Sequence, residues 1–400
     1  MIGWIMLSRQ AVASAEAALK GDQLGVRDEI GFLSLHQAFS DRFFPGTSVL
    51  HTRIRYALFV PWLMEAAQGN PQQLRKLELA LTWQLNLGSD KGNGVIGGSI
   101  PNRLPVQPAS MIYWTALARW HILHPRPDWV VSSRGEVLSK IAAGVKVTAG
   151  RVRSEDGESP DDELHDVFAS VPSRPPHFLR SGEAMDFNLT APERKFLRKH
   201  LIGVCRGAET PTQQSLLARI ADARLSVRSV AAPWAGLVRE VADREDKAAL
   251  TIAKRAAALA GIGRAAYAAL VEDAKAKDGG QRNTRHRDDV EKLVSQMGAD
   301  AIKLDLSALN GMAPGLPAYL LDVLTETQEW LVSGRQRVDS LQDVYRTAEV
   351  RRKGARARLA DNLGGKNRRA EWSADEHPLA EPLHFRWGNV RRLLNDLEAP

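Results

Sequence analysis

The interpretation of this 400-residue chain depends on one stretch, Phe44-Pro45-Gly46-Thr47-Ser48-Val49-Leu50-His51-Thr52-Arg53-Ile54-Arg55-Tyr56-Ala57-Leu58-Phe59-Val60-Pro61-Trp62-Leu63. Its first three residues predict a turn, because Pro fixes φ and Gly accepts a positive φ. Thr47 or Ser48 is then placed to cap a helix, in which apolar residues recur at helical spacing. Pro61 lacks a backbone N–H, so we expect it to kink or end this helix and to leave Val60 extended.

Two arginines of this stretch, Arg53 and Arg55, would lie about 200° apart on such a helix. They would therefore not share a surface. One interpretation is a core helix with two solvated or ion-paired arginines. The other places one guanidinium on a phosphate or on a carboxylate of a partner, where a planar donor fork gives two parallel hydrogen bonds.

The bulk composition is that of a water-soluble globular protein, with 44% hydrophobic and 25% charged residues. A chain of this length predicts two or three domains. Cys205 is the single cysteine, so an intrachain disulfide and a multi-cysteine zinc site are excluded. The apolar run at the start, Met1 to Leu7, is too short for a membrane span or a signal peptide. We expect no membrane association and a cytoplasmic location.

Positive charge is concentrated near the C-terminus. The chain has a net charge of +7, and the segment from Gly334 to Glu371 contains eleven basic residues against four acidic ones before Glu371, so this segment alone accounts for the excess. Its pattern predicts a helix with one packed face and one positive face, followed by a flexible basic loop at 364–369. The residues that we expect to bind an anionic partner are Arg351, Arg352, Lys353, Arg356, Arg358, Lys366, Arg368 and Arg369, with Arg53 and Arg55 as secondary candidates.

The predicted fold class is mainly α, in four parts. Residues 1–150 form a helical domain that is compatible with a winged-helix arrangement, and 151–182 form an acidic, proline-containing linker. Residues 183–333 form a second helical domain. Residues 334–400 hold the basic helix and a C-terminal docking helix.

Several local signals support the helices of this division. Thr190, Pro192 and Glu193 have the spacing of a capping box, with Leu189 as a hydrophobic staple. The alanine-rich segment 234–277 is helical by propensity, with a break expected at Gly261 and Gly263. The apolar positions of 385–396 predict a terminal helix that is docked by one face.

A glycine-rich loop, Gly88 to Ser99, precedes a predicted helix from Met111 to His121 that Ser110 caps. The loop does not fit a phosphate-binding loop, because Lys91 is not followed by Ser or Thr at the start of a helix. A turn or wing is the better interpretation. The wing would place a neighbouring helix against DNA, whereas aromatic residues at helical spacing are more often core.

No motif for catalysis or metal binding was found, so we expect no catalytic residue, no metal and no cofactor. His36, His51 and His121 are the candidates for acid–base work if a site is assembled from distant residues. His121 and His124 lack an Asp, Glu or Cys at the spacing of a metal site.

Four segments resemble one family: 44–63, the pair GVIGG and PASMIYWTALARWHI, FNLTAPERKFLR, and HFRWGNVRRLLND. The chain is similar in these segments to an uncharacterised bacterial family catalogued as domain of unknown function 6361. This resemblance implies no established activity. Members of the family are associated with bacterial gene clusters for DNA metabolism or phage defence.

Three functions remain open at this level. The first is a nucleic-acid-associated accessory protein that is not an enzyme, which binds double-stranded DNA through the basic C-terminal helix. The second is a protein–protein scaffold that recruits a helicase or nuclease, with hydrophobic hot spots and a mild dependence on salt. The third is an enzyme without a recognisable motif. We expect the first, because the positive charge is localised.

Overall fold

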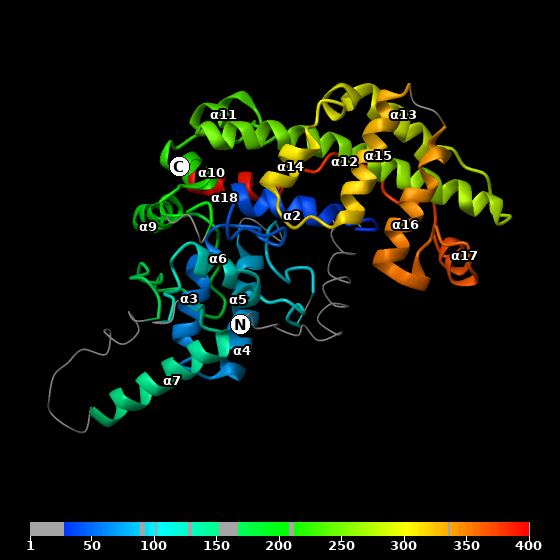
Figure 1. The fold of residues 1–400 in the computed structure, drawn as a ribbon. Coiled ribbons are helices and arrows are strands. Elements are labelled where there is room, and N and C mark those ends of the chain that lie inside the picture. The colour runs from blue at the N-terminus through cyan, green and yellow to red at the C-terminus, as the bar shows by residue number, and fades with distance from the viewer. Residues whose placement is uncertain are drawn as a thin grey trace. The chain divides into compact units, whose positions relative to one another are not determined.

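The computed structural model describes residues 28–88, 93–100, 102–126, 130–151, 167–207, 212–334 and 337–399, with the backbone alone for 146–151 (Figure 1). These residues form helices joined by turns and loops, so the predicted mainly-α class is confirmed. Over these ranges there is no β-strand, and two isolated bridges join Leu123 to Phe168 and Cys205 to Gln214. In the same ranges, no helix combines the length and the apolar character that a membrane span requires.

The chain divides into two compact units that do not follow its order. Of the described residues, unit 1 takes 41–231 and 386–399, and unit 2 takes 28–40 and 232–385. The first division falls inside α2 (Phe32–Phe43). Residues on both sides of the segment predicted as a linker, 151–182, therefore belong to the same unit.

Unit 1 is built from helices of 4 to 18 residues. They are α3 (Tyr56–Ala66), α4 (Pro71–Leu87), α5 (Ala109–Ile112), α6 (Trp114–Arg119), α7 (Arg134–Arg151), α9 (Ala191–Ile202), α10 (Leu216–Asp222) and α18 (Trp387–Glu398). The C-terminal helix α18 packs on α9, and α9 packs on α10. Trp387, Val390 and Leu394 of α18 are buried as predicted.

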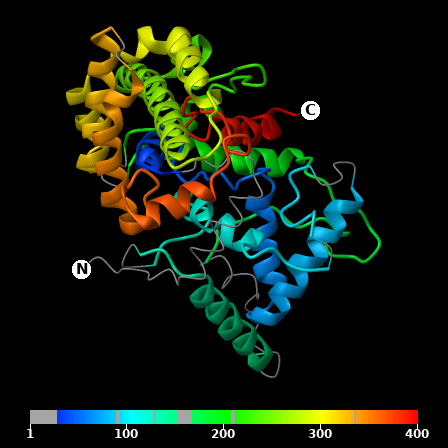
Figure 2. The ribbon, with the colours of Figure 1, turned by 90° about the vertical axis from the view of Figure 1, so that its right-hand side faces the viewer.

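Unit 2 is organised around one long helix, α12 (Arg244–Lys277), with α13 packed along it (Figure 2). The other elements are α11 (Gly236–Val241), α13 (Arg285–Ala301), α14 (Leu306–Met312), α15 (Ala318–Val332), η1 (Val338–Leu341), α16 (Gln342–Lys353), η2 (Gly354–Arg356) and α17 (Leu363–Ala370). Of these, α11, α14, α15, η1 and α17 also contact α12.

The helix predicted from Thr47 or Ser48 starts later, at Tyr56. Pro45 and Gly46 form the expected turn, with Gly46 at φ +80°, but the chain continues in turns as far as Arg55. The Thr47 hydroxyl donates to the Phe44 carbonyl at 2.7 Å and caps no helix. An end of the helix at Pro61, with Val60 extended, is wrong, because α3 continues through both residues to Ala66. Since every residue from Tyr56 to Met64 is buried, packing offsets the roughly 3 kcal/mol that an internal proline costs.

The helix predicted over 111–121 is two short helices that meet at Tyr113. Ser110 does not cap it, since Pro108 precedes α5 and the Ser110 N–H donates to the Glu78 carboxylate at 3.0 Å. The Tyr113 hydroxyl accepts from the Thr52 N–H at 3.1 Å and donates to the Arg53 carbonyl at 2.7 Å. These long-range bonds fix Tyr113 as core. The winged-helix detail is not confirmed, since residues 93–100 form turns, while 89–92 lie outside the described residues.

The break expected at Gly261 and Gly263 is wrong, because α12 runs through both. A Cβ at Gly263 would lie 2.9 Å from both the Phe32 ring and the Tyr345 hydroxyl, and one at Gly261 would lie 3.3 Å from Pro382. These glycines therefore allow neighbouring elements to approach the helix closely. Their role is packing, for which helix propensity gives no signal.

The basic loop predicted at 364–369 is helix α17. Asn362 caps it, and its side chain accepts from the Gly365 N–H at 2.7 Å. A Cβ at Gly365 would lie 2.3 Å from the Ala360 carbonyl oxygen, so the helix lies directly on the preceding turn. The capping box at Thr190 and Glu193 is confirmed, with both reciprocal bonds present at the start of α9.

Candidate nucleic-acid interface

The structure places the predicted basic residues on three consecutive elements of unit 2. Arg351, Arg352 and Lys353 form the last turn of α16, and Arg356 lies in η2. Arg358 follows η2, and α17 contributes Lys366, Arg368 and Arg369. We call these eight residues the basic block.

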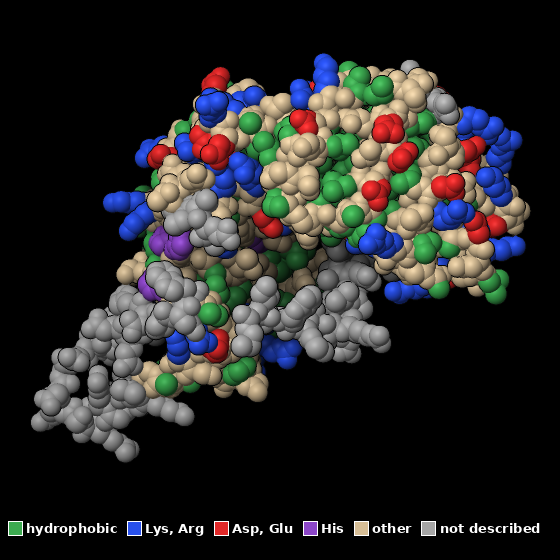
Figure 3. All heavy atoms as spheres, in the orientation of Figure 1, with side chains coloured by type: hydrophobic (Ala, Val, Ile, Leu, Met, Phe, Trp, Pro, Cys, Tyr) green, Lys and Arg blue, Asp and Glu red, His purple; other side chains and the backbone are tan. Residues whose placement is uncertain are grey.

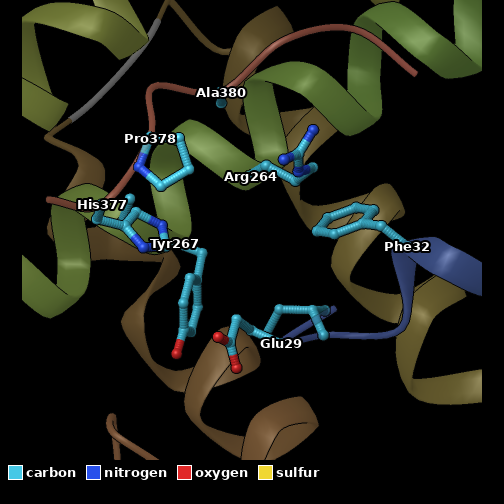
Figure 4. Close-up of a pocket in the computed structure, with 9 residues that line it drawn as sticks. Glu29, Phe32, Arg264, Tyr267, His377, Pro378 and Ala380 are labelled. Atoms are coloured by element: carbon cyan, nitrogen blue, oxygen red, sulfur yellow. The ribbon is translucent and has the colours of Figure 1, made fainter. Parts of the chain in front are cut away.

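Four members of the basic block are bound to carboxylates from distant segments of unit 2. Arg352 pairs with Asp28, Lys353 pairs with Glu29, and Arg358 donates to Glu29 at 2.7 Å. Figure 4 shows the Glu29 carboxylate and the Tyr267 hydroxyl on the same side of a small cavity that Arg264 also lines.

The fourth of these residues, Arg369, has only 7% of its side chain exposed, and it pairs with Asp278 at 2.6 Å. It also donates to the Ala360 carbonyl at 3.0 Å. The carboxylates that neutralise the block come from segments far away in the sequence, namely the stretch before α2 and the end of α12. Half of the predicted positive residues are therefore neutralised within unit 2, and Arg369 is also buried.

The rest of the basic block is exposed. Arg351 lies over the Tyr319 ring at 5.9 Å, and Arg368 pairs with Glu371 three residues later at 2.7 Å. Arg356 has no ion pair within the described part of the chain. Lys366 lies near Asp278, where it helps Arg369 to lower the pKa of that carboxyl.

The two secondary candidates lie in unit 1, in the turns before α3, and each is held by carboxylates. Arg53 donates to Asp396 at 3.0 Å, and its guanidinium lies 4.4 Å from the centre of the Phe187 ring. Arg55 is 4% exposed and donates to Glu193 at 2.8 Å. Both arginines are therefore ion-paired within the fold, as the first interpretation has it.

Charge is distributed very unequally between the two units. Counted over the full sequence, the residues assigned to unit 2 include 25 Lys and Arg against 25 Asp and Glu. Those of unit 1 include 29 Lys and Arg against 22 Asp and Glu, an excess of 7 positive charges. The unit that contains the basic block is thus neutral by sequence, and the net charge of +7 belongs to the other unit.

Helix α9 presents much of this charge. Its capping box and Pro192 set the start, and Leu197 and Leu201 are buried at 1% exposure each. Lys195 and Lys199 are four residues apart and exposed, so they share the outer face. Figure 3 shows Lys and Arg side chains, with Asp and Glu among them and histidine side chains beside them, on the surface around α9 and α10.

Arg198 joins this helix to its neighbours. It donates to the Ala221 carbonyl of α10 at 3.0 Å and pairs with Glu398 of α18 at 2.7 Å. The exposed Arg224 follows, and its own N–H also bonds to the Ala221 carbonyl. We call Lys195, Lys199 and Arg224, with the half-buried His200, the α9 face.

Histidines border the α9 face. His200 donates through Nδ1 to the Trp120 carbonyl at 2.9 Å. Burial lowers its pKa, and the positive charge of Lys199 and the neighbouring His121 and His124 lower it further. Burial, Arg119 and His124 likewise lower the pKa of His121. The described residues contain no group of three or more His, Cys, Asp or Glu placed to hold a metal.

Two of the candidates for acid–base chemistry, His51 and His36, are buried. His51 is fully buried, its Nε2 donates to the Ile112 carbonyl at 3.2 Å, and its Nδ1 accepts from the Ser48 N–H at 3.2 Å. Both ring nitrogens are used, so His51 has no free position for proton transfer. His36 is buried in unit 2 against His384, with ring centroids 5.6 Å apart.

The α9 face was missed because acids elsewhere in the sequence conceal it. From Arg194 to Arg228 there are eight Lys and Arg against Glu209 and Asp222. Seven acids between Glu155 and Asp166 cancel this excess in any sum over the remainder of the chain. A charge sum over a sliding window would have found the second basic region.

The chain belongs to the family of unknown function DUF6361, whose model matches residues 2–271. The matched part contains α9 and α10, and the basic block lies beyond it. No curated protein and no solved structure matches the chain.

Proposed function

We propose that this protein binds nucleic acid, with double-stranded DNA as its ligand, as a non-enzymatic accessory protein of a bacterial DNA-processing or defence system. The contact surface is the α9 face of unit 1. The observation that carries the proposal is the location of the net charge: the whole excess of 7 positive charges belongs to unit 1, where the segment from Arg194 to Arg228 has eight Lys and Arg against two acids. A polyanion that releases condensed counterions is the partner that such a surface favours.

The geometry of the α9 face suits a phosphate backbone. Four residues of helix separate Lys195 from Lys199 by about 6 Å along the axis. Successive phosphates of one DNA strand advance by about 3.4 Å along the duplex axis, so the two ammonium groups match phosphates about two steps apart. Arg224 adds a third exposed cation. It follows Ala221, whose carbonyl accepts from Arg198 of α9.

The surface predicted from the sequence alone, the basic block, takes a secondary place in this proposal. Arg351, Arg356 and Lys366 are its exposed residues without a strong carboxylate pair, and they provide a matched comparison. The equal numbers of acids and bases in unit 2 weaken the long-range attraction of this surface for a polyanion.

The test measures binding of the full-length protein to a labelled random duplex of about 25 base pairs and to the corresponding single strand, over a salt series. One variant carries Lys195→Gln, Lys199→Gln and Arg224→Gln. The matched variant carries Arg351→Gln, Arg356→Gln and Lys366→Gln, so both lose three exposed positive charges. Each lost phosphate contact reduces the slope of log K against log salt by about 0.9.

We expect the first variant to lose more than tenfold in affinity at about 0.1 M salt and to flatten the salt slope by two or more, while the second stays within about threefold of wild type. A loss confined to the second variant would assign binding to the basic block and overturn the α9 assignment. Absence of binding to either nucleic acid at low salt would overturn the proposal as a whole, and would favour the scaffold function instead.

A further inference from the structure

Unit 1 contains a second feature that the nucleic-acid proposal does not use, a cavity of about 530 Å³. This volume lies within the range of small-molecule sites, which is about 300–1,000 Å³. Its lining comes from the turns before α3, from the loop and helices of 107–119, and from the residue that precedes α18. The polar lining residues are Asp41, Thr47, Ser48, His51, Gln107, Thr115, Arg119 and Arg386.

One wall of this cavity is held rigidly by buried contacts. The Trp120 indole N–H donates to the Pro45 carbonyl at 3.1 Å, and a Cβ at Gly46 would lie 2.8 Å from that indole nitrogen. His51 stacks on Tyr113 at 4.3 Å between ring centroids and bridges Ser48 and Ile112. Burial lowers the pKa of His51 to about 4, so its ring is neutral at pH 7. The wall is therefore pre-formed.

The charge inside the cavity is positive. Arg386 donates to the Asp41 carboxylate at 2.6 Å and to the Thr47 carbonyl at 2.8 Å, with 13% of its side chain exposed. Arg119 also lines the cavity, and no carboxylate of the described residues pairs with it. Two guanidinium groups thus face a single carboxylate, which leaves one cation without a counter-charge.

The uncharged residues of the lining indicate what the uncharged part of a ligand would be. Leu50, Met111 and Ile112 are apolar, and Met111 is 43% exposed. The Gln107 amide and the Thr115 hydroxyl supply hydrogen-bonding groups. A ligand that fits has an anionic group for the guanidinium and an apolar or planar body with a few polar atoms.

We infer that this cavity binds a nucleoside monophosphate, with the phosphate on Arg119 and the base against the apolar wall. The cavity adjoins the region of the α9 face through Trp120, whose carbonyl accepts from His200. The phosphorylated nucleotide is therefore either free or the 5′ end of a bound strand. Binding of a strand end rests on the proposed function, whereas binding of a free nucleotide does not.

The test is calorimetric titration of the full-length protein with adenosine and thymidine 5′-monophosphates, with the nucleosides, and with inorganic phosphate. A short oligonucleotide with and without a 5′-phosphate forms a separate arm. Arg119→Gln removes the unpaired cation, and Met111→Trp fills the cavity from an exposed position. The Lys195/Lys199/Arg224 triple variant serves as the control that leaves the cavity intact.

We expect micromolar to millimolar binding of a monophosphate, at least tenfold weaker binding of the nucleoside, and a loss of at least tenfold in both cavity variants but not in the triple variant. If the wild type prefers the 5′-phosphorylated oligonucleotide and Arg119→Gln abolishes this preference, the phosphate in the cavity comes from the end of a strand. If the wild type shows no such preference, the ligand is the free nucleotide. Failure to bind any monophosphate at millimolar concentration overturns the inference, as does binding that both cavity variants retain. Neither result bears on duplex binding at the α9 face.

Discussion

The α9 face and the basic block contain similar residues and differ in what surrounds them. In unit 2, Asp28, Glu29 and Asp278 reach the block from distant segments and bind half of its cations. In unit 1, Lys195 and Lys199 have no such carboxylates among the described residues. A run of positive residues in a sequence therefore forms a positive surface only when the fold brings no acids to it.

The largest expected effect is on the stability of the fold, and it shows whether Arg55 serves the fold or a ligand. Arg55→Ala would leave the Glu193 carboxylate buried at 2% exposure without its cation. Removal of one partner from a buried ion pair costs about 3 to 5 kcal/mol, so we expect a loss of that size in the free energy of unfolding, measured by urea denaturation. A change below about 1 kcal/mol would mean that Arg55 is available to a ligand after all.

The next effect concerns the basic block itself. Arg369→Ala removes the bonds to Asp278 and to the Ala360 carbonyl, and we expect a loss of about 2 to 3 kcal/mol in the stability of unit 2. Its neighbour Arg368 is exposed and pairs only with Glu371, so Arg368→Ala should change stability by less than about 0.5 kcal/mol. Equal small effects in both variants would contradict the view that Arg369 is internal structure of unit 2.

A smaller effect depends on pH and acts on unit 1. The folded state holds His51 neutral, because its pKa is lowered to about 4 from an ordinary 6.5. As the pH falls below 6.5, the unfolded chain takes up a proton at this residue and the folded chain does not, so stability is lost between pH 6.5 and 4. At pH 5 the expected loss is about 2 kcal/mol relative to pH 7.5.

This prediction is checked by urea denaturation at pH 7.5 and pH 5 for the wild type and for His51→Gln. The variant is less stable at pH 7.5, since it loses the stacking on Tyr113, but its stability should decline less on acidification. Other histidines titrate in both proteins and cancel in the difference. An identical decline in the two proteins would show that His51 is not the group that senses acid.

Local sequence was enough for some of the fold. The capping box at Thr190 and the docked helix that begins at Trp387 were predicted correctly, because their signals lie within one or two helical turns. The α-helical class followed from periodicity for the same reason. The number of positive residues in the C-terminal segment also follows from the sequence alone, but their pairing does not.

Tertiary structure decided the rest. Pro61 was expected to kink or end its helix and Gly263 to break one, but burial around α3 and close packing on α12 keep both helices continuous. The charge that is open to a ligand was decided in the same way, since Asp28 and Asp278 neutralise residues that lie far away in the chain. Sequence determines which helices form and how many charges the chain carries. Only the folded chain decides which charges meet each other, because ion pairs and packing contacts join residues that no local pattern relates.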